Sequence, residues 1–240
     1  MSENPLLPHN KLRELHALMV RARNLDRKLT PRGSAREALL AATLIQLLPG
    51  DLLSGLPGDG VVEKLAPEDK RQRAAGSLLG APSFESRLEA SAAAARGLQA
   101  AGADGLLLAF ARAGTLEPRW PVALEWAQQT QLPLVLACSD ATNGISPASR
   151  KRTEPALDFT NISRFAKRLK LPVLTVDGED AVAVYRVMQE SVLRARVGGG
   201  PSVLWAVMTP TRSAASMPAS SQPVARLRSY LAARKIPLRA

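Results

Sequence analysis

The hydrophobic positions of this chain form helical stripes in some segments and short continuous runs in others. Leucine and methionine recur at helical spacing over residues 10–29, which predicts an amphipathic helix. Segments rich in alanine and leucine predict two more helices, over residues 35–48 and 86–101. Proline and glycine follow the first of these two helices and glycine ends the second, as expected where helices stop.

Four short apolar runs predict β-strands, and helical segments separate them. The runs cover residues 106–110, 132–138, 171–176 and 203–208. The intervening helices are expected over residues 120–129, 158–169 and 181–197. Strands that alternate with helices indicate an α/β fold with a parallel central sheet and helices on both faces. We expect one such domain over residues 1–208, followed by a Ser/Pro-rich segment and a short basic helix within residues 209–240.

Composition narrows the class of protein. The chain has 240 residues, of which 46% are hydrophobic, so it can bury a substantial core. No apolar run approaches the roughly 18 residues of a membrane span. The first residues lack a basic stretch followed by an apolar one, so no signal peptide is predicted and the cytoplasm is the expected location. The lone Cys138 excludes an intrachain disulfide and a cysteine-based metal cluster.

The strongly basic balance raises the question of an acidic partner. The formal net charge is +11, and the cations gather in residues 21–36, 64–73, 150–170 and 226–239. They alternate with leucine and alanine at helical spacing, as on solvated helix faces, and no nucleic-acid-binding module accompanies them. A solvated surface or an acidic protein partner is therefore favoured over nucleic acid, and no membrane partner is expected.

Residue patterns for nucleophilic catalysis are weak. Cys138 ends an apolar run, and no histidine follows it in the chain. His9 and His16 lie in or just before the first helix, where we expect both to be on the surface. We therefore assign no catalytic residue.

Two segments resemble a known enzyme family. Residues 176–212, VDGEDAVAVYRVMQESVLRARVGGGPSVLWAVMTPTR, contain a VDG-x-D, a helix ending in A-R-x-G-x-G-P and a strand. Residues 33–51, GSAREALLAATLIQLLPGD, contain an E-A helix that runs into P-G-D. Both resemble the alpha subunits of thiamine-diphosphate-dependent 2-oxo acid dehydrogenases of the pyruvate, branched-chain and acetoin types. The resemblance covers most of residues 12–212 and implies a thiamine-diphosphate-binding-type fold.

The resemblance also locates a cofactor site in which two expected magnesium ligands are replaced. The family's G-D-G, whose aspartate binds magnesium, falls on Ala111-Arg112-Ala113. Its asparagine pair falls on Asp140-Ala141, with the ligand position at Ala141, and its backbone ligand falls on Asn143. Arg112, Asp140 and Asn143 are thus the candidate cofactor-binding residues of an altered site. No metal ligand is assigned, because a guanidinium repels magnesium and a methyl group cannot bind it.

Three functional hypotheses follow. The first is an alpha-like protein that does not bind magnesium and thiamine diphosphate in the family's manner and has a structural or regulatory role. It would pair with itself or with a beta-like subunit. The second is a chain that still supports oxidative decarboxylation of a 2-oxo acid when a beta subunit is present. The third is a protein that binds an anionic metabolite or nucleic acid through Arg112 and its basic surface.

Overall fold

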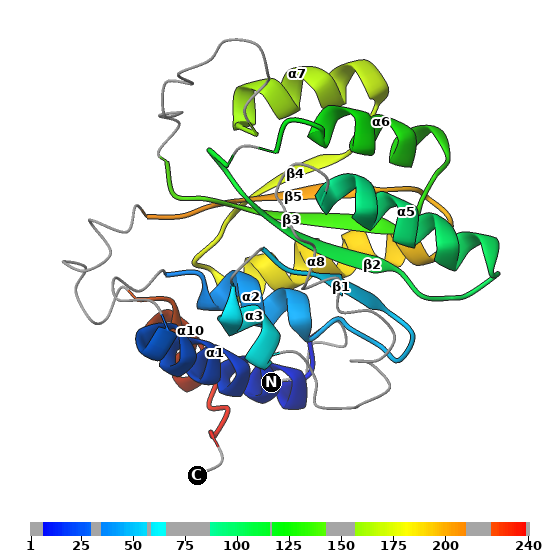
Figure 1. The fold of residues 1–240 in the computed structure, drawn as a ribbon. Helices are drawn as coiled ribbons and strands as arrows, with labels where there is room; N and C mark the ends of the chain where they lie inside the picture. The colour runs from blue at the N-terminus through cyan, green and yellow to red at the C-terminus, as the bar shows by residue number, and fades with distance from the viewer. Residues whose placement is uncertain are drawn as a thin grey trace.

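A computed structural model describes residues 7–29, 35–56, 59–65, 87–115, 117–142, 157–209 and 222–238. Its centre is a parallel sheet of five strands in the order β1-β2-β3-β5-β4 (Figure 1). The strands are β1 (Leu52–Ser54), β2 (Leu107–Arg112), β3 (Leu134–Asp140), β4 (Val173–Asp177) and β5 (Ser202–Val207). The predicted α/β fold with a parallel sheet is confirmed.

Helices cover both faces of the sheet. The upper layer in Figure 1 contains α5 (Arg87–Ala100), α6 (Trp120–Gln129) and α7 (Phe159–Leu169). The lower layer contains α1 (His9–Leu29), α2 (Glu37–Leu44), α3 (Gly60–Leu65), α8 (Ala181–Arg196) and α10 (Pro223–Ala233). The chain crosses the sheet in one direction from β1 to β4 and then returns to β5. Because parallel crossovers are right-handed, this reversal places α8 on the opposite face from α5, α6 and α7.

Each face of the sheet has its own hydrophobic core. Leu107 and Ala109 of β2 pack into the upper core with α5, α6 and α7. Leu108 and Phe110 pack into the lower core, where the buried side chains of α1, α2, α8 and α10 meet. Successive side chains of a strand point to opposite faces, so the pleat determines which layer each strand residue contacts.

The strands differ from the predicted ones by one or two residues at each end. Both β2 and β3 extend two residues beyond the predicted ends, so that Arg112 and Asp140 are the last residues of strands instead of loop residues. The strand β1 was not predicted, because a strand of three residues is too short to show a period. It pairs with β2, Leu53 lying opposite Leu108.

The helix predictions are confirmed except near the amino terminus. The α2 helix ends at Leu44, four residues before its predicted end. The short α3 helix was not among the predicted helices. The α10 helix contributes Val224, Leu227 and Leu231 to the lower core. Among the described helices, none is both long and apolar enough to span a membrane.

The prediction that both histidines lie on the surface was wrong for His16. Its side chain is buried on the face of α1 that carries Leu12, Leu15 and Met19, and its Nε2 atom has no hydrogen-bond partner among the residues that the structure describes. Burial lowers the pKa of His16, and the nearby Arg228 guanidinium of α10 lowers it further.

At the amino-terminal end of the sheet, one carboxylate joins three segments. The Asp51 carboxylate accepts hydrogen bonds from the backbone N–H groups of Leu48 and Leu106, at 2.7 and 3.0 Å. It also forms a bidentate ion pair with Arg196 at the end of α8, with N–O distances of 3.0 and 2.6 Å. The P-G-D motif is therefore a structural connection between α2, β2 and α8.

Candidate functional site

The candidate site lies at the carboxyl ends of β2 and β3, where ligands of open α/β sheets usually bind. Arg112 ends β2, and it pairs in register with Ser139 of β3. Asp140 ends β3, and it pairs with Val207 of β5. Both candidate residues thus lie at the carboxyl ends of neighbouring strands.

The pleat of the sheet nevertheless separates Arg112 from Asp140. Arg112 follows Leu108 and Phe110 at a period of two, so its side chain is on the lower face. Asp140 follows Leu136 and Cys138 at the same period, so its side chain is on the upper face. The two candidate residues therefore do not converge on one ligand.

Arg112 is an exposed cation in a charged environment. Partial desolvation lowers its pKa, the neighbouring Arg36 guanidinium lowers it further, and Asp59 and Asp26 oppose this. The guanidinium stays protonated at neutral pH, because arginine in proteins is effectively always charged. Within the part of the chain that the structure describes, no hydrogen bond or ion pair to the Arg112 side chain is present. This arginine can therefore donate to an external anion.

A charged cluster that the sequence did not predict lies beside Arg112. Arg36, just before α2, pairs through one nitrogen with Asp59 and donates through the other to Asp59 and Asp26, at 2.8 and 3.4 Å. Burial alone lowers the pKa of Arg36, but the bonds to Asp59 and Asp26 raise it more. Asp59 also accepts from the N–H of Val61 and so caps α3. The cluster joins α1, α2 and α3 beneath the end of β2.

The neighbouring Glu37 adds a second ion pair to this layer. Its carboxylate accepts from Nε and one terminal nitrogen of Arg23 of α1, at 3.0 and 2.5 Å. Burial raises the pKa of Glu37, while Arg23 opposes the shift. The family-like E-A helix therefore begins with a structural ion pair.

The Asp140 carboxylate is held by its own chain. One oxygen accepts from the N–H and the hydroxyl of Thr142, at 2.8 and 2.5 Å. The other oxygen accepts from the indole N–H of Trp205 of β5, at 3.0 Å. Asp140 is also almost fully buried. Both carboxylate oxygens are thus bonded to neighbouring groups of the chain at the end of β3 and do not face a ligand.

The described residues do not fit a magnesium ion held as in the family. Magnesium requires near-octahedral oxygen ligands, and the two positions at which the sequence resemblance implies such ligands hold Arg112 and Ala141, whose side chains carry no oxygen. No group of three or more candidate ligand side chains is present among the residues that the structure describes. Asn143, the predicted backbone ligand, lies outside the described residues.

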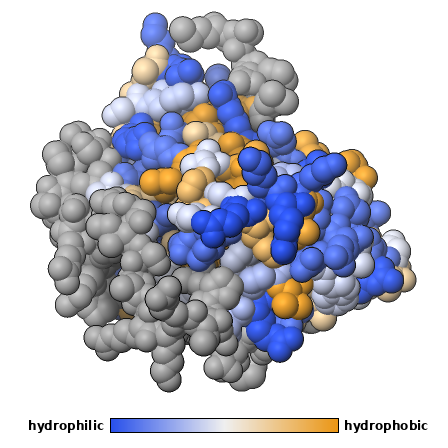
Figure 2. Space-filling model, turned by 90° about the horizontal axis from the view of Figure 1, so that it is seen from above, coloured by the Kyte–Doolittle hydropathy of each residue, from blue (hydrophilic) through white to orange (hydrophobic). Residues whose placement is uncertain are grey.

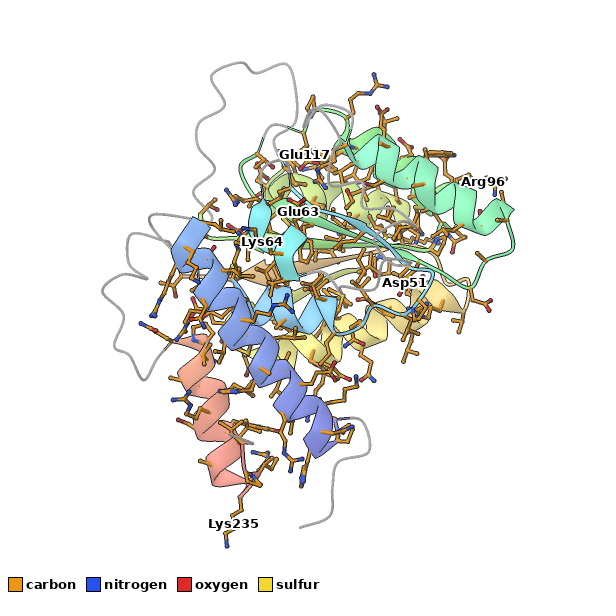
Figure 3. All side chains as sticks on the ribbon, turned by 60° about the horizontal axis from the view of Figure 1, so that its bottom comes forward. Asp51, Glu63, Lys64, Arg96, Glu117 and Lys235 are labelled. Carbon is orange, nitrogen blue, oxygen red and sulfur yellow. The ribbon has the colours of Figure 1, made fainter. Side chains whose placement is uncertain are left out.

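Above the sheet, a buried ion pair lies where β1 and β2 end. Arg87 of α5 and Glu117, which follows β2 and is labelled in Figure 3, pair at 2.7 Å with 1% of each side chain exposed. Arg87 also donates to the hydroxyl of Ser54, which accepts from Ser91. Burial raises the pKa of Glu117, and Arg87 opposes the shift. Within the described ranges, the Nε atom of Arg87 and one oxygen of Glu117 have no hydrogen-bond partner.

Cys138 lies in the same upper core and is completely buried. Burial raises its pKa well above the usual value, and the charges of Asp140 and Glu117 add to the shift. The thiol therefore stays protonated at neutral pH.

Comparison with known proteins confirms the resemblance seen in the sequence. The sequence profile of the family described as "Dehydrogenase E1 component" matches residues 113–209. That segment extends from the end of β2 to the end of β5 and includes the region of Asp140. The chain is thus similar to the alpha subunits of this family over its central and carboxyl-terminal strands.

Two curated relatives are similar to part of the chain. The alpha subunit of acetoin:2,6-dichlorophenolindophenol oxidoreductase from Bacillus subtilis is 35% identical over 91 residues. The alpha subunit of 3-methyl-2-oxobutanoate dehydrogenase from Mycobacterium tuberculosis is 34% identical over 116 residues. These matches cover 38% and 48% of this chain, but only 25% and 30% of the relatives.

Solved structures support the fold over a larger part of the chain. A structure described as a candidate thiamin diphosphate-dependent enzyme from Mycobacterium smegmatis matches 74% of this chain, with a TM-score of 0.54 and 17% identity. Benzoylformate decarboxylase from Polynucleobacter necessarius matches 77%, with a TM-score of 0.53 and 15% identity. The matches cover 32% and 34% of those chains, so they show a shared fold. The predicted thiamine-diphosphate-binding-type fold is confirmed.

Proposed function

We propose that this chain is an alpha-like protein of the thiamine-diphosphate-dependent 2-oxo acid dehydrogenases whose half-site does not bind the cofactor through magnesium. Its role in this proposal is structural or regulatory, within a pair formed with a beta-like subunit or with a second copy. The proposal rests on the family match over residues 113–209 and on the side chains at the ends of β2 and β3.

The observation that carries the proposal is Arg112 at the end of β2. The resemblance places the family's first magnesium ligand at this position, and a guanidinium there adds a positive charge instead of a ligand oxygen. Two unit charges 4 Å apart repel by roughly 1–4 kcal/mol at effective dielectrics of 80 to 20, and magnesium carries two charges. The only carboxylate at the end of β3 among the described residues, Asp140, is buried and bonded to Thr142 and Trp205.

Calorimetric titration with thiamine diphosphate tests the proposal directly. Thiamine diphosphate is titrated into the chain in the presence of 1 mM Mg²⁺, about the physiological magnesium concentration. A separate titration is done in the presence of EDTA. We expect no magnesium-dependent heat of binding. Binding that appears with Mg²⁺ and disappears with EDTA would overturn the proposal and favour an active alpha subunit.

A second candidate function is supported by the charge of Arg112 itself. An exposed guanidinium that lacks an ion pair among the described residues can bind the oxygens of a phosphate or carboxylate directly. In that case thiamine diphosphate or inorganic diphosphate binds equally with and without EDTA, and the Arg112→Ala variant loses binding. Exposed Arg186→Ala on α8 is the matched control and should retain it.

Assembly is tested separately by light scattering coupled to gel filtration. An alpha-like chain that pairs with itself is expected to elute with twice the mass of the 25.6 kDa chain. A monomer that also fails to bind a co-expressed beta-type subunit would contradict the structural role.

A further inference from the structure

The upper helical layer has an apolar groove between α6 and α7. The groove has a volume of about 380 Å³. Its floor includes Trp120 and Phe165, whose rings meet edge to face with centroids 5.0 Å apart. Pro121 and Val122 of α6 form one wall, while Arg164 and Arg168 of α7 form part of the other.

Two apolar side chains of α6 are exposed at the groove or next to it. Val122 is 53% exposed and Trp126, one turn further along α6, is 37% exposed. Figure 2 shows apolar side chains lying among hydrophilic ones on this face of the molecule. Clustered exposed apolar groups with a polar rim are typical of protein–protein contact sites.

The rim of the groove is positive on the α7 side. Arg164, Lys167 and Arg168 are all exposed, and α7 contains no acidic residue between Phe159 and Leu169. Arg168 lies over the ring of Phe165, 5.2 Å from its centroid, so it covers apolar surface while its charge faces outward. Among the described residues that line the groove, Glu125 of α6 is the one with an acidic side chain.

From this geometry we propose that the α6–α7 groove docks an amphipathic helix of another protein that carries carboxylates beside its apolar stripe. The apolar stripe fills the groove beside Val122, and the carboxylates pair with Arg164 and Arg168. Helices recognise grooves of this kind through apolar residues spaced three or four apart. This inference does not depend on the proposed function, because the groove lies on the upper helical layer, away from Arg112.

Charge favours a different protein over a second copy of this chain. The chain has 32 lysine and arginine residues against 21 acidic ones, so two copies repel each other at a basic surface. Two of the segments outside the described residues also lack the required acidity. Residues 143–156 contain three cations and a single acid, and residues 210–221 contain no acid.

A designed peptide provides the test. The probe is a fluorescein-labelled 14-residue helical peptide with leucine at helical spacing and glutamate on both sides of the stripe. The control peptide has glutamine in place of each glutamate. Binding to the full chain is measured by fluorescence anisotropy at low and high salt. We expect the glutamate peptide to bind at least about tenfold more tightly than the glutamine peptide, because several carboxylates can each pair with a rim arginine.

Variants of exposed residues locate the site without unfolding the protein. Arg164→Glu should weaken binding of the glutamate peptide about tenfold, because it replaces attraction by repulsion. Arg186→Glu changes the net charge equally but lies on α8, on the opposite face, and should weaken binding less than threefold. Val122→Ser should weaken binding of both peptides, since it removes the exposed wall of the groove.

Three results would overturn the proposal. The first is that Arg164→Glu and Arg186→Glu weaken binding of the glutamate peptide equally, and the second is that the glutamate and glutamine peptides bind equally well. The third is that the glutamate peptide does not bind at a concentration of 1 mM, about the limit of a weak interaction. The circular dichroism spectrum of each variant should match that of the unchanged chain, because each substituted side chain is exposed.

Discussion

The buried pair of Arg87 and Glu117 allows a quantitative test of the upper core. We consider three variants: Arg87→Met, Glu117→Leu and the double variant. Each single change removes one partner of an ion pair that is 99% buried and leaves the other charge without compensation. The double change replaces the pair with apolar side chains of similar length.

The expected magnitudes follow from burial. Breaking a buried ion pair by removing one partner costs about 3–5 kcal/mol, whereas replacing both partners is often neutral or stabilising. In a chain of this size 1 kcal/mol shifts the melting temperature by about 2–4 °C, so each single variant should melt about 6–20 °C lower. The double variant should lie within about 5 °C of the unchanged chain, because Ser54 retains its bond from Ser91.

The free energy of unfolding is measured at pH 7 by urea titration monitored by circular dichroism. The double-mutant cycle then gives the coupling energy between Arg87 and Glu117. A further check uses pH. Burial raises the pKa of Glu117, and Arg87→Met removes the group that opposes this shift. Because the pKa of Glu117 is higher in the folded chain than the unfolded value of 4.5, protonation of Glu117 stabilises the fold below pH 4.5, and this stabilisation is lost as the pH rises. The cost of Arg87→Met should therefore be smaller at pH 5 than at pH 7. A cost below about 1 kcal/mol in both single variants would refute the reasoning, because that is the range of a solvated ion pair.

Three further predictions concern other parts of the lower layer and the sheet. Gly105→Ala should destabilise the fold by about 1–3 kcal/mol in urea unfolding, since the added Cβ would lie 2.4 Å from the carbonyl oxygen of Gly50. The control, Gly97→Ala, adds a Cβ in open space within α5 and should be neutral or stabilise the fold by up to about 1 kcal/mol. Equal losses of stability in the two variants would contradict this prediction. Asp51→Asn should lower the free energy of unfolding by about 3 kcal/mol, because it removes the buried charge that pairs with Arg196; a loss under about 1 kcal/mol would show that the amide replaces the carboxylate. Because the pKa of His16 is lowered in the folded chain, its contribution to the free energy of unfolding is fully present above the unfolded pKa of 6.5 and is lost as the pH falls below that value. The His16→Leu variant should therefore lose less free energy of unfolding between pH 7.5 and 5.5 than the unchanged chain. An equal decrease in both proteins would assign the pH dependence to other groups.

The elements with strong local signals were predictable from the sequence. The α6 helix has its predicted bounds, because its apolar residues repeat clearly and Pro121 is tolerated in its first turn. The α8 helix begins at its predicted residue, where Asp180 caps it by accepting from the N–H groups of Val182 and Ala183. Such elements need no tertiary context to be recognised.

The parts that were missed depend on contacts between distant segments. The β1 strand is defined by its pairing with β2, and α3 is capped by Asp59, which in turn is held by Arg36 of a different segment. His16 is polar, so the sequence suggested a surface position, but it lies on the buried face of α1 against α10. No local pattern indicates these contacts.

The candidate cofactor site shows how two additional strand residues change a functional interpretation. With strands expected to end at Phe110 and Cys138, Arg112 and Asp140 would be loop residues, free to point toward the same ligand. Because β2 and β3 continue to these residues, the pleat directs Arg112 to the lower face and Asp140 to the upper face. Ala141, one residue further along, packs against the lower core and is therefore on the side of Arg112. A carboxylate at position 140 thus does not substitute for an amide at position 141, although the two are adjacent in sequence. A ligand oxygen that is shifted by one position along a strand lies on the opposite face of the sheet. The residue types at the carboxyl ends of β2 and β3 therefore do not by themselves specify a magnesium site.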